Sequence, residues 1–220
     1  MKDVIDLKSP ANILTIIVVG LCAVVPFLAP ALGEPFYVIV FARIMVWAIA
    51  AVSLNLIMGY GGMISFGHAV YLGIGAYAIG ILAFHGVTSA WIQWPVAIGA
   101  CAVISLIFGA ISLRTRGVYF IMITLALAQM LFFLSVSAER YGSDDGLNIL
   151  ARSDFGVSFF SLEDNMTMYY TIFAFLLASV FVSWKLVHSR FGVVMRAAKS
   201  NETRVQAVGV STYRYRLTAF

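Results

Sequence analysis

Six long apolar runs constrain the fold of this chain more than any other feature of its sequence. A bilayer core about 30 Å thick is crossed by roughly 20 apolar residues, because a helix rises about 1.5 Å per residue. Runs close to that length, separated by polar or charged breaks, cover residues 11–32, 36–58, 68–84, 91–113, 118–138 and 168–187. They predict an all-α integral membrane protein, a polytopic helical bundle with about six complete transmembrane helices.

A further apolar stretch begins near Leu217, shortly before the 220-residue sequence ends. A span cannot be completed in so few residues. We therefore expect residues 1–220 to be the N-terminal part of one transmembrane domain, with the start of a seventh helix at its end.

Composition agrees with a lipid environment. Hydrophobic residues make up 62% and charged residues 11% of the chain, against about 45–50% and about 25% in soluble domains. The net charge of +4 is too small to indicate a nucleic-acid partner. Cys22 and Cys101 lie inside apolar runs, where a thiol usually packs as an inert group, so we expect no metal site and no bound cofactor.

The charges of the loops predict an orientation. Residues 185–216 hold seven basic residues and one acid, and the turn after the fourth run carries Arg114 and Arg116. Residues 139–164 hold six acids and two basic residues. Because basic loops stay on the cytoplasmic side, six spans with a cytoplasmic N-terminus place every one of these loops on its expected side.

The first apolar run has two interpretations. Lys2 and Lys8 precede it and Ala29-Pro30-Ala31 loosely resembles a cleavage site, as in a secretory signal peptide. Its apolar stretch is longer than the usual core of a signal peptide, which is about 7–15 residues. A retained span is the favoured interpretation.

A glycine-rich break separates the second and third runs. Gly59, Gly61, Gly62 and Gly67 fall where the two runs meet, and glycine interrupts helices. A broken backbone at membrane depth needs cover from protein or a water-filled cavity, and such breaks often build substrate sites in transporters. The alternative is a simple cytoplasmic turn. The spacing of these glycines matches no phosphate-binding loop.

Polar residues near this break and in the fifth run are the candidate pathway residues. A polar side chain in lipid needs a partner or a polar cavity, although hydrogen bonding between helices is an equally good account of Gln129. The proposed substrate pathway comprises Asn55, Gly59, Gly62, Ser65, His68, Tyr71, Thr124 and Gln129.

Two other classes of function are weakened by what the runs contain. They hold no Asp or Glu, whereas an ion-coupled secondary transporter usually keeps an intramembrane carboxylate. Ser65 and His68 are three residues apart, but no acid lies nearby to orient the histidine, so a membrane enzyme is not expected. Arg43, inside the second run, has a functional and a structural interpretation that are equally supported.

Two polar segments are candidate docking surfaces. Residues 139–165 form a long connection in which Asp144, Asp145 and Gly146 make either a solvated turn or an external docking site. The basic segment 188–213 predicts two short helices, with Ser200 or Asn201 as the cap of the second and Gly209 as its stop. It either rests on anionic headgroups or docks into a groove of a cytoplasmic partner.

Several of these segments together resemble the permease subunits of branched-chain amino-acid ABC transporters, over roughly residues 40–220. The residues that carry the resemblance are Leu54-Asn55-Leu56-x-x-Gly59-Tyr60-x-Gly62-x-x-Ser65-x-Gly67-His68, Gly73-Ile-Gly75-Ala76-Tyr77, Arg116-Gly117, Thr124-Leu-Ala126, Gln129-Met, Asp144-Asp145-Gly146, Arg190-Phe191-Gly192, Asn201-Glu202 and Gly209. The family often has Glu-Ala before the last glycine, where this chain has Gln206-Ala207-Val208.

The resemblance implies the rest of a transport machine in a bacterial inner membrane. A second permease subunit would pair with this one, two cytoplasmic ATPase subunits would use ATP, and a periplasmic binding protein would deliver Leu, Ile or Val. Urea, short amides or other amino acids are the alternative substrates. This chain would itself be no enzyme. The residues that would couple it to the ATPases are Arg190, Phe191, Gly192, Arg196, Asn201, Glu202, Gln206, Ala207 and Gly209.

Overall fold

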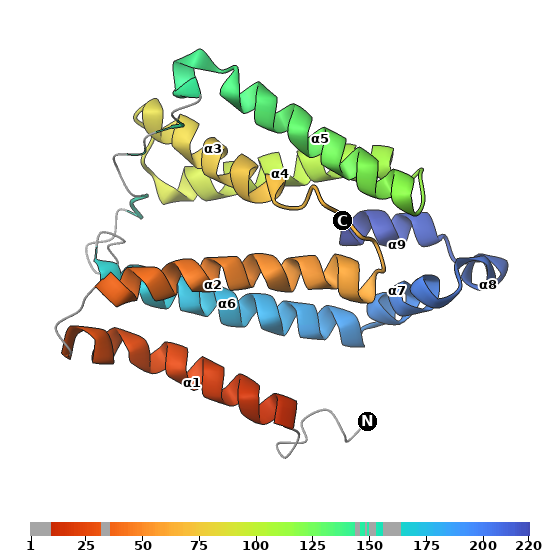
Figure 1. Ribbon diagram of the computed structural model, residues 1–220, viewed down its shortest axis with the longest axis horizontal. Helices are drawn as coiled ribbons and strands as arrows, with labels where there is room; N and C mark the ends of the chain where they lie inside the picture. The colour runs from red at the N-terminus through yellow and green to blue at the C-terminus, as the bar shows by residue number, and fades with distance from the viewer. Residues whose placement is uncertain (1–9, 32–35, 144–145, 148, 150–152, 156–163) are drawn as a thin grey trace.

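The computed structural model describes residues 10–31, 36–143, 146–147, 149, 153–155 and 164–220, and these residues form helices and connecting segments (Figure 1). The all-α prediction is confirmed for this part of the chain. The helices are α1 (Pro10–Ala31), α2 (Phe36–Asn55), the π-helical turn η1 (Leu56–Tyr60), α3 (Val70–Phe84), α4 (Ala90–Ser112), α5 (Val118–Val136), the short 3₁₀ turn η2 (Glu139–Tyr141), α6 (Asn165–His188), α7 (Arg190–Ser200), α8 (Glu202–Ala207) and α9 (Thr212–Ala219).

One core lies between α1, α2 and α6, which run side by side in the lower part of Figure 1. Met45 of α2 and Tyr169 of α6 are buried at its centre. The Tyr169 hydroxyl donates a hydrogen bond to the Cys22 carbonyl of α1 at 2.6 Å. The first apolar run therefore packs as a helix against two later ones.

A second group of helices, α3, α4 and α5, forms the upper part of Figure 1. Trp94 of α4 meets Phe175 of α6 with ring centroids 5.3 Å apart, which links this group to the first. A second core joins the two groups at the end of the bundle where α7, α8 and α9 lie, and it is built on Ile57, Met63, Phe120 and Met195.

Helices α1 to α6 alternate in direction, so the loops gather at two ends (Figure 1). We call the end that carries the 61–69 segment, the α4–α5 turn and helices α7 to α9 the basic end, because the segment 185–216 and the turn bring Arg and Lys there. At the opposite end, Glu139 begins η2 after α5, the Asp154 backbone pairs with Thr88 and Ala90 at the start of α4, and Asp164 caps the start of α6. The loops predicted to share a side of the membrane thus share an end of the bundle.

Among the residues that the structure describes, four helical stretches are long and apolar enough to cross a membrane: Phe36–Tyr60, Ala90–Ser112, Val118–Val136 and Asn165–His188. The prediction of six spans is not established by this criterion. Helix α3 has 15 residues, and only the Val18–Leu28 part of α1 is described in full. The first and third spans therefore stay predictions, and this is a multi-pass membrane protein by its four qualifying stretches.

Arg43 is exposed on α2, and it makes no ion pair with a residue that the structure describes. The side chains that bury α2 against α6 and α1, such as Met45, lie on another face.

Candidate functional site

The glycine-rich segment between η1 and α3 is irregular, and Gly62 within it has a φ of 66°. From residue 61 to residue 67 buried and exposed residues alternate. The buried positions are Gly61, Met63, Ser65 and Gly67, and the exposed ones are Gly62, Ile64 and Phe66. We call residues 61–69 the glycine segment.

Two glycines let this segment pass between its neighbours. A Cβ at Gly61 would lie 2.6 Å from the Ile57 carbonyl oxygen and 2.9 Å from Met195 Cε of α7. A Cβ at Gly67 would lie 2.3 Å from the Thr124 carbonyl oxygen of α5. Because real Cβ atoms do not approach a carbonyl oxygen so closely, both positions require glycine. The segment packs closely between α7 and α5.

Four of the predicted pathway residues lie in or beside the glycine segment and its contact with α5. Ser65 is 4% exposed and its hydroxyl finds no hydrogen-bond partner among the described residues. His68 Nε2 lies 3.1 Å from the Ser53 hydroxyl, whereas its buried Nδ1 is also without a partner there. The Tyr71 ring packs edge-on against His68, and Thr124 is buried beside Gly67. Buried polar atoms without partners are costly and therefore uncommon in folded proteins.

The other predicted pathway residues are placed elsewhere. Asn55 lines a cavity of about 220 Å³ between α2 and α6, and its side chain lies against Gly59. Gln129 is exposed on α5, five residues beyond Thr124 and on another side of the helix. Gly62, with φ of 66°, belongs to a different cavity at the basic end. The predicted pathway residues therefore do not form one site, because they lie at the glycine segment, at two cavities and on the exposed surface of α5.

The basic segment forms the short helices α7 and α8. Asn201 caps α8, since its side-chain oxygen accepts a hydrogen bond from the Arg204 backbone N–H at 3.0 Å. Gly209 ends this helix with φ of 86°, a conformation that glycine adopts without strain. The prediction of two short helices with this cap and this stop is confirmed.

The predicted coupling residues differ in exposure. Gly192 and Met195 are buried on one face of α7, and the Phe191 ring packs against the Tyr215 ring of α9. Arg190 and Arg196 are exposed on the same helix. The last residues of α8 and the residues that follow it are also exposed. They are Gln206, Ala207, Val208 and Gly209, and Val208 is 82% exposed.

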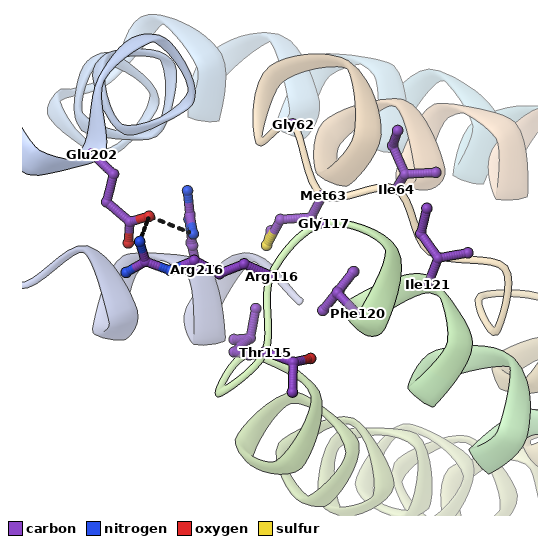
Figure 2. Close-up of a pocket in the computed structure, with 11 residues that line it drawn as sticks. Gly62, Met63, Ile64, Thr115, Arg116, Gly117, Phe120, Ile121, Glu202 and Arg216 are labelled. Carbon is purple, nitrogen blue, oxygen red and sulfur yellow. Dashed lines mark ion pairs between the residues drawn. The ribbon is translucent and has the colours of Figure 1, made fainter.

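Glu202 points inward instead. Figure 2 shows its carboxylate facing Arg116 and Arg216, at distances of 3.5 Å and 3.2 Å, beside a cavity of about 210 Å³. Gly62, Met63, Ile64 and Phe120 contribute to the wall of this cavity (Figure 2). The cavity therefore has a charged side, formed by α8, α9 and Arg116 of the α4–α5 turn, and an apolar side, formed by the glycine segment and α5.

Sequence reasoning missed several residues that hold this end together. Lys199 donates a hydrogen bond to the Gly59 carbonyl at 2.6 Å, so α7 is tied to the end of η1. Thr212 and Arg216 of α9 both bind Glu202. The sequence offered only a run of basic residues, and nothing in that pattern separates a lysine or arginine with a partner from one in solvent.

The predicted external docking residues are only partly visible. Asp144 and Asp145 lie outside the described residues, and Gly146 has φ of 79°. Nearby, Trp91 of α4 donates a hydrogen bond to the Phe155 carbonyl at 3.3 Å. The docking role of this loop stays a prediction.

A model of the branched-chain amino acid transport system permease component matches residues 36–220. That match covers every described helix after α1, and it includes the glycine segment and the short helices α7 and α8. The chain belongs to this permease family. Its members are transport components.

Two relatives within the family are similar along most of the chain. Both are described as the high-affinity branched-chain amino acid transport system permease protein LivM, one from Escherichia coli (strain K12) and one from Salmonella typhimurium (strain LT2). They are 25% and 23% identical to this permease over 198 residues, which cover 80% of this chain and 47% of theirs. The chain thus spans about half the length of these relatives. No solved structure matches it.

Proposed function

We propose that this permease forms part of the translocation pathway of an ATP-driven importer for branched-chain amino acids. The match over residues 36–220 carries the proposal, because it includes both the glycine segment and the short helices of the basic end. ATP hydrolysis is assigned to two separate cytoplasmic subunits, and a second permease subunit completes the pathway. This chain binds no cofactor of its own.

The orientation follows from charge. The basic end faces the cytoplasm of a bacterial cell, with the N-terminus on that side, because basic loops are retained there. An ATPase subunit docks on the exposed end of α8 around Val208, the kind of apolar residue that a groove on a partner can bury. A periplasmic binding protein meets the opposite end, near residues 139–155.

The substrate passes near the glycine segment. The unpartnered Ser65 hydroxyl and His68 Nδ1 support this assignment, since each offers a hydrogen bond that no described residue takes. Thr124 is buried where α5 approaches the same segment. Leucine, isoleucine or valine is the proposed substrate, carried over from the name of the family.

The energy source tests this function. In cells that depend on the protein for uptake of radiolabelled leucine, uptake should stop when arsenate depletes ATP and continue when an uncoupler collapses the proton gradient. An ATPase should co-purify with the tagged protein when it is extracted from its native membrane. Excess isoleucine or valine should compete with leucine, and urea should not.

Each opposite result has a distinct meaning. Uptake that follows the proton gradient, by a protein that carries no ATPase, would identify an ion-coupled carrier and contradict the proposal. Competition by urea or short amides alone would keep the importer and replace its substrate.

A further inference from the structure

The carboxylate of Glu202 is bound by partners within this chain. Its Oε1 accepts hydrogen bonds from the Thr212 hydroxyl at 2.9 Å and from Gln206 Nε2 at 3.4 Å. Its Oε2 faces the guanidinium groups of Arg216 at 3.2 Å and Arg116 at 3.5 Å (Figure 2). Because its side chain is only 16% exposed, a cytoplasmic partner cannot bind this carboxylate without displacing these groups.

The partners of Glu202 differ in strength and in position. Arg116, in the turn between α4 and α5, is 71% exposed, and solvent weakens an ion pair of that kind. Arg216 of α9 is 20% exposed and Thr212, at the start of α9, is 1% exposed. The strong connection therefore joins α8 to α9, and the connection to the α4–α5 turn is the weaker one.

Helix α9 in turn contacts the upper group of helices. The Tyr213 hydroxyl donates a hydrogen bond to the Ala110 carbonyl of α4 at 3.5 Å. The Phe220 ring, directly after α9, lies 6.2 Å from the Tyr71 ring of α3 and 6.3 Å from the Phe120 ring of α5. Contacts thus run from α8 through Glu202 and α9 to the helices that flank the glycine segment.

We propose that Glu202 is a positioning residue that fastens α8 to α9, so that movement of an ATPase docked on α8 reaches α3, α4 and α5. The inference rests on the proposed function, and it changes the predicted role of this residue. Glu202 holds the docking helix in place from inside, while Val208 and its exposed neighbours meet the partner. Coupling by a rigid, internally bonded element is a physical route for such a signal.

Hydrogen exchange tests the connection itself. In the purified complex, Glu202→Gln should speed amide exchange in residues 202–219 about tenfold, because a helix that loses its tertiary anchor opens more often. Arg216→Gln should do the same. The double variant should exchange little faster than either single variant, since both remove one interaction. Glu139→Gln, at the opposite end, is the matched control and should leave these amides unchanged.

Transport distinguishes a positioning residue from a direct ATPase contact. Glu202→Gln should keep the ATPase in the complex and lower the leucine carried per ATP hydrolysed by about tenfold, with the KM for leucine unchanged. Loss of the ATPase from this variant, or an unchanged transport ratio, would overturn the inference.

The two proposals fail in different ways. Unchanged exchange in Glu202→Gln would overturn the connection alone and leave the importer intact. A wild-type protein that carries no ATPase and shows no ATP-driven uptake would overturn the proposed function and the transmission with it, whatever the exchange measurement gives.

Discussion

Replacing Gly67 by alanine should destabilise this permease by about 3 kcal/mol, near the upper part of the usual range for overpacking, and abolish uptake. The new Cβ would lie 2.3 Å from the Thr124 carbonyl oxygen and 3.0 Å from its carbonyl carbon. These are backbone atoms of α5, so no flexible side chain can move aside to make room. Thermal unfolding in detergent and leucine uptake measure the two effects.

Gly73→Ala is the matched control for this substitution. Gly73 lies in α3, six residues further along the chain, and a Cβ built there meets nothing within 4 Å. Alanine also favours a helix by about 1 kcal/mol over glycine. The control should therefore be at least as stable as the wild-type protein and keep its uptake. A Gly67→Ala protein as stable and active as the control would show that the glycine segment does not pass against α5 as described.

Val208→Asp should remove the ATPase from the complex. Val208 is 82% exposed at the end of α8, and a charge buried at the centre of an interface costs about 2 kcal/mol or more, which corresponds to about a thirtyfold loss of affinity. The measurement is the amount of ATPase that co-purifies with the tagged permease. Glu202 and the Asn201 cap do not involve the valine side chain, so α8 itself should remain folded.

Two controls make the result specific to this surface. Val208→Thr keeps the shape of the side chain without a charge and should retain the ATPase. Ile149→Asp adds the same charge to a residue that is 45% exposed and lies beside Gly80 in the later part of α3, away from the basic end, and it should also retain the ATPase. Equal loss in both aspartate variants would mean that the basic end is not the docking surface.

The sequence predicts the helices well because their cause is local. Apolar runs of the right length predicted α2, α4, α5 and α6 to within three residues at either end when the π-helical turn is counted with α2. The Asn201 cap and the Gly209 stop were also predictable, since both depend on residues close in the chain. The number of membrane spans was less accessible, because α3 has only 15 residues.

The candidate site depends on contacts between distant residues, and a single sequence does not contain them. Ser65, His68 and Thr124 were grouped by their polarity in apolar surroundings, and the structure places all three at the glycine segment, while their role in a pathway stays a prediction. Gln129 has the same polarity but is exposed on another side of α5. Glu202 was predicted to meet a partner protein, whereas its carboxylate is bound by Arg216, which only the packing of α9 against α8 could reveal.

The most direct test labels each end of the bundle from one side of the membrane. Cysteine is introduced at Glu139 or at Ser200, both exposed, after Cys22 and Cys101 are replaced by alanine. A membrane-impermeant maleimide added to cells with a permeabilised outer membrane should label position 139 and leave position 200 unlabelled until the inner membrane is opened. Equal labelling of both positions in sealed cells would contradict a bilayer between the two ends, and with it the transport function proposed for this chain.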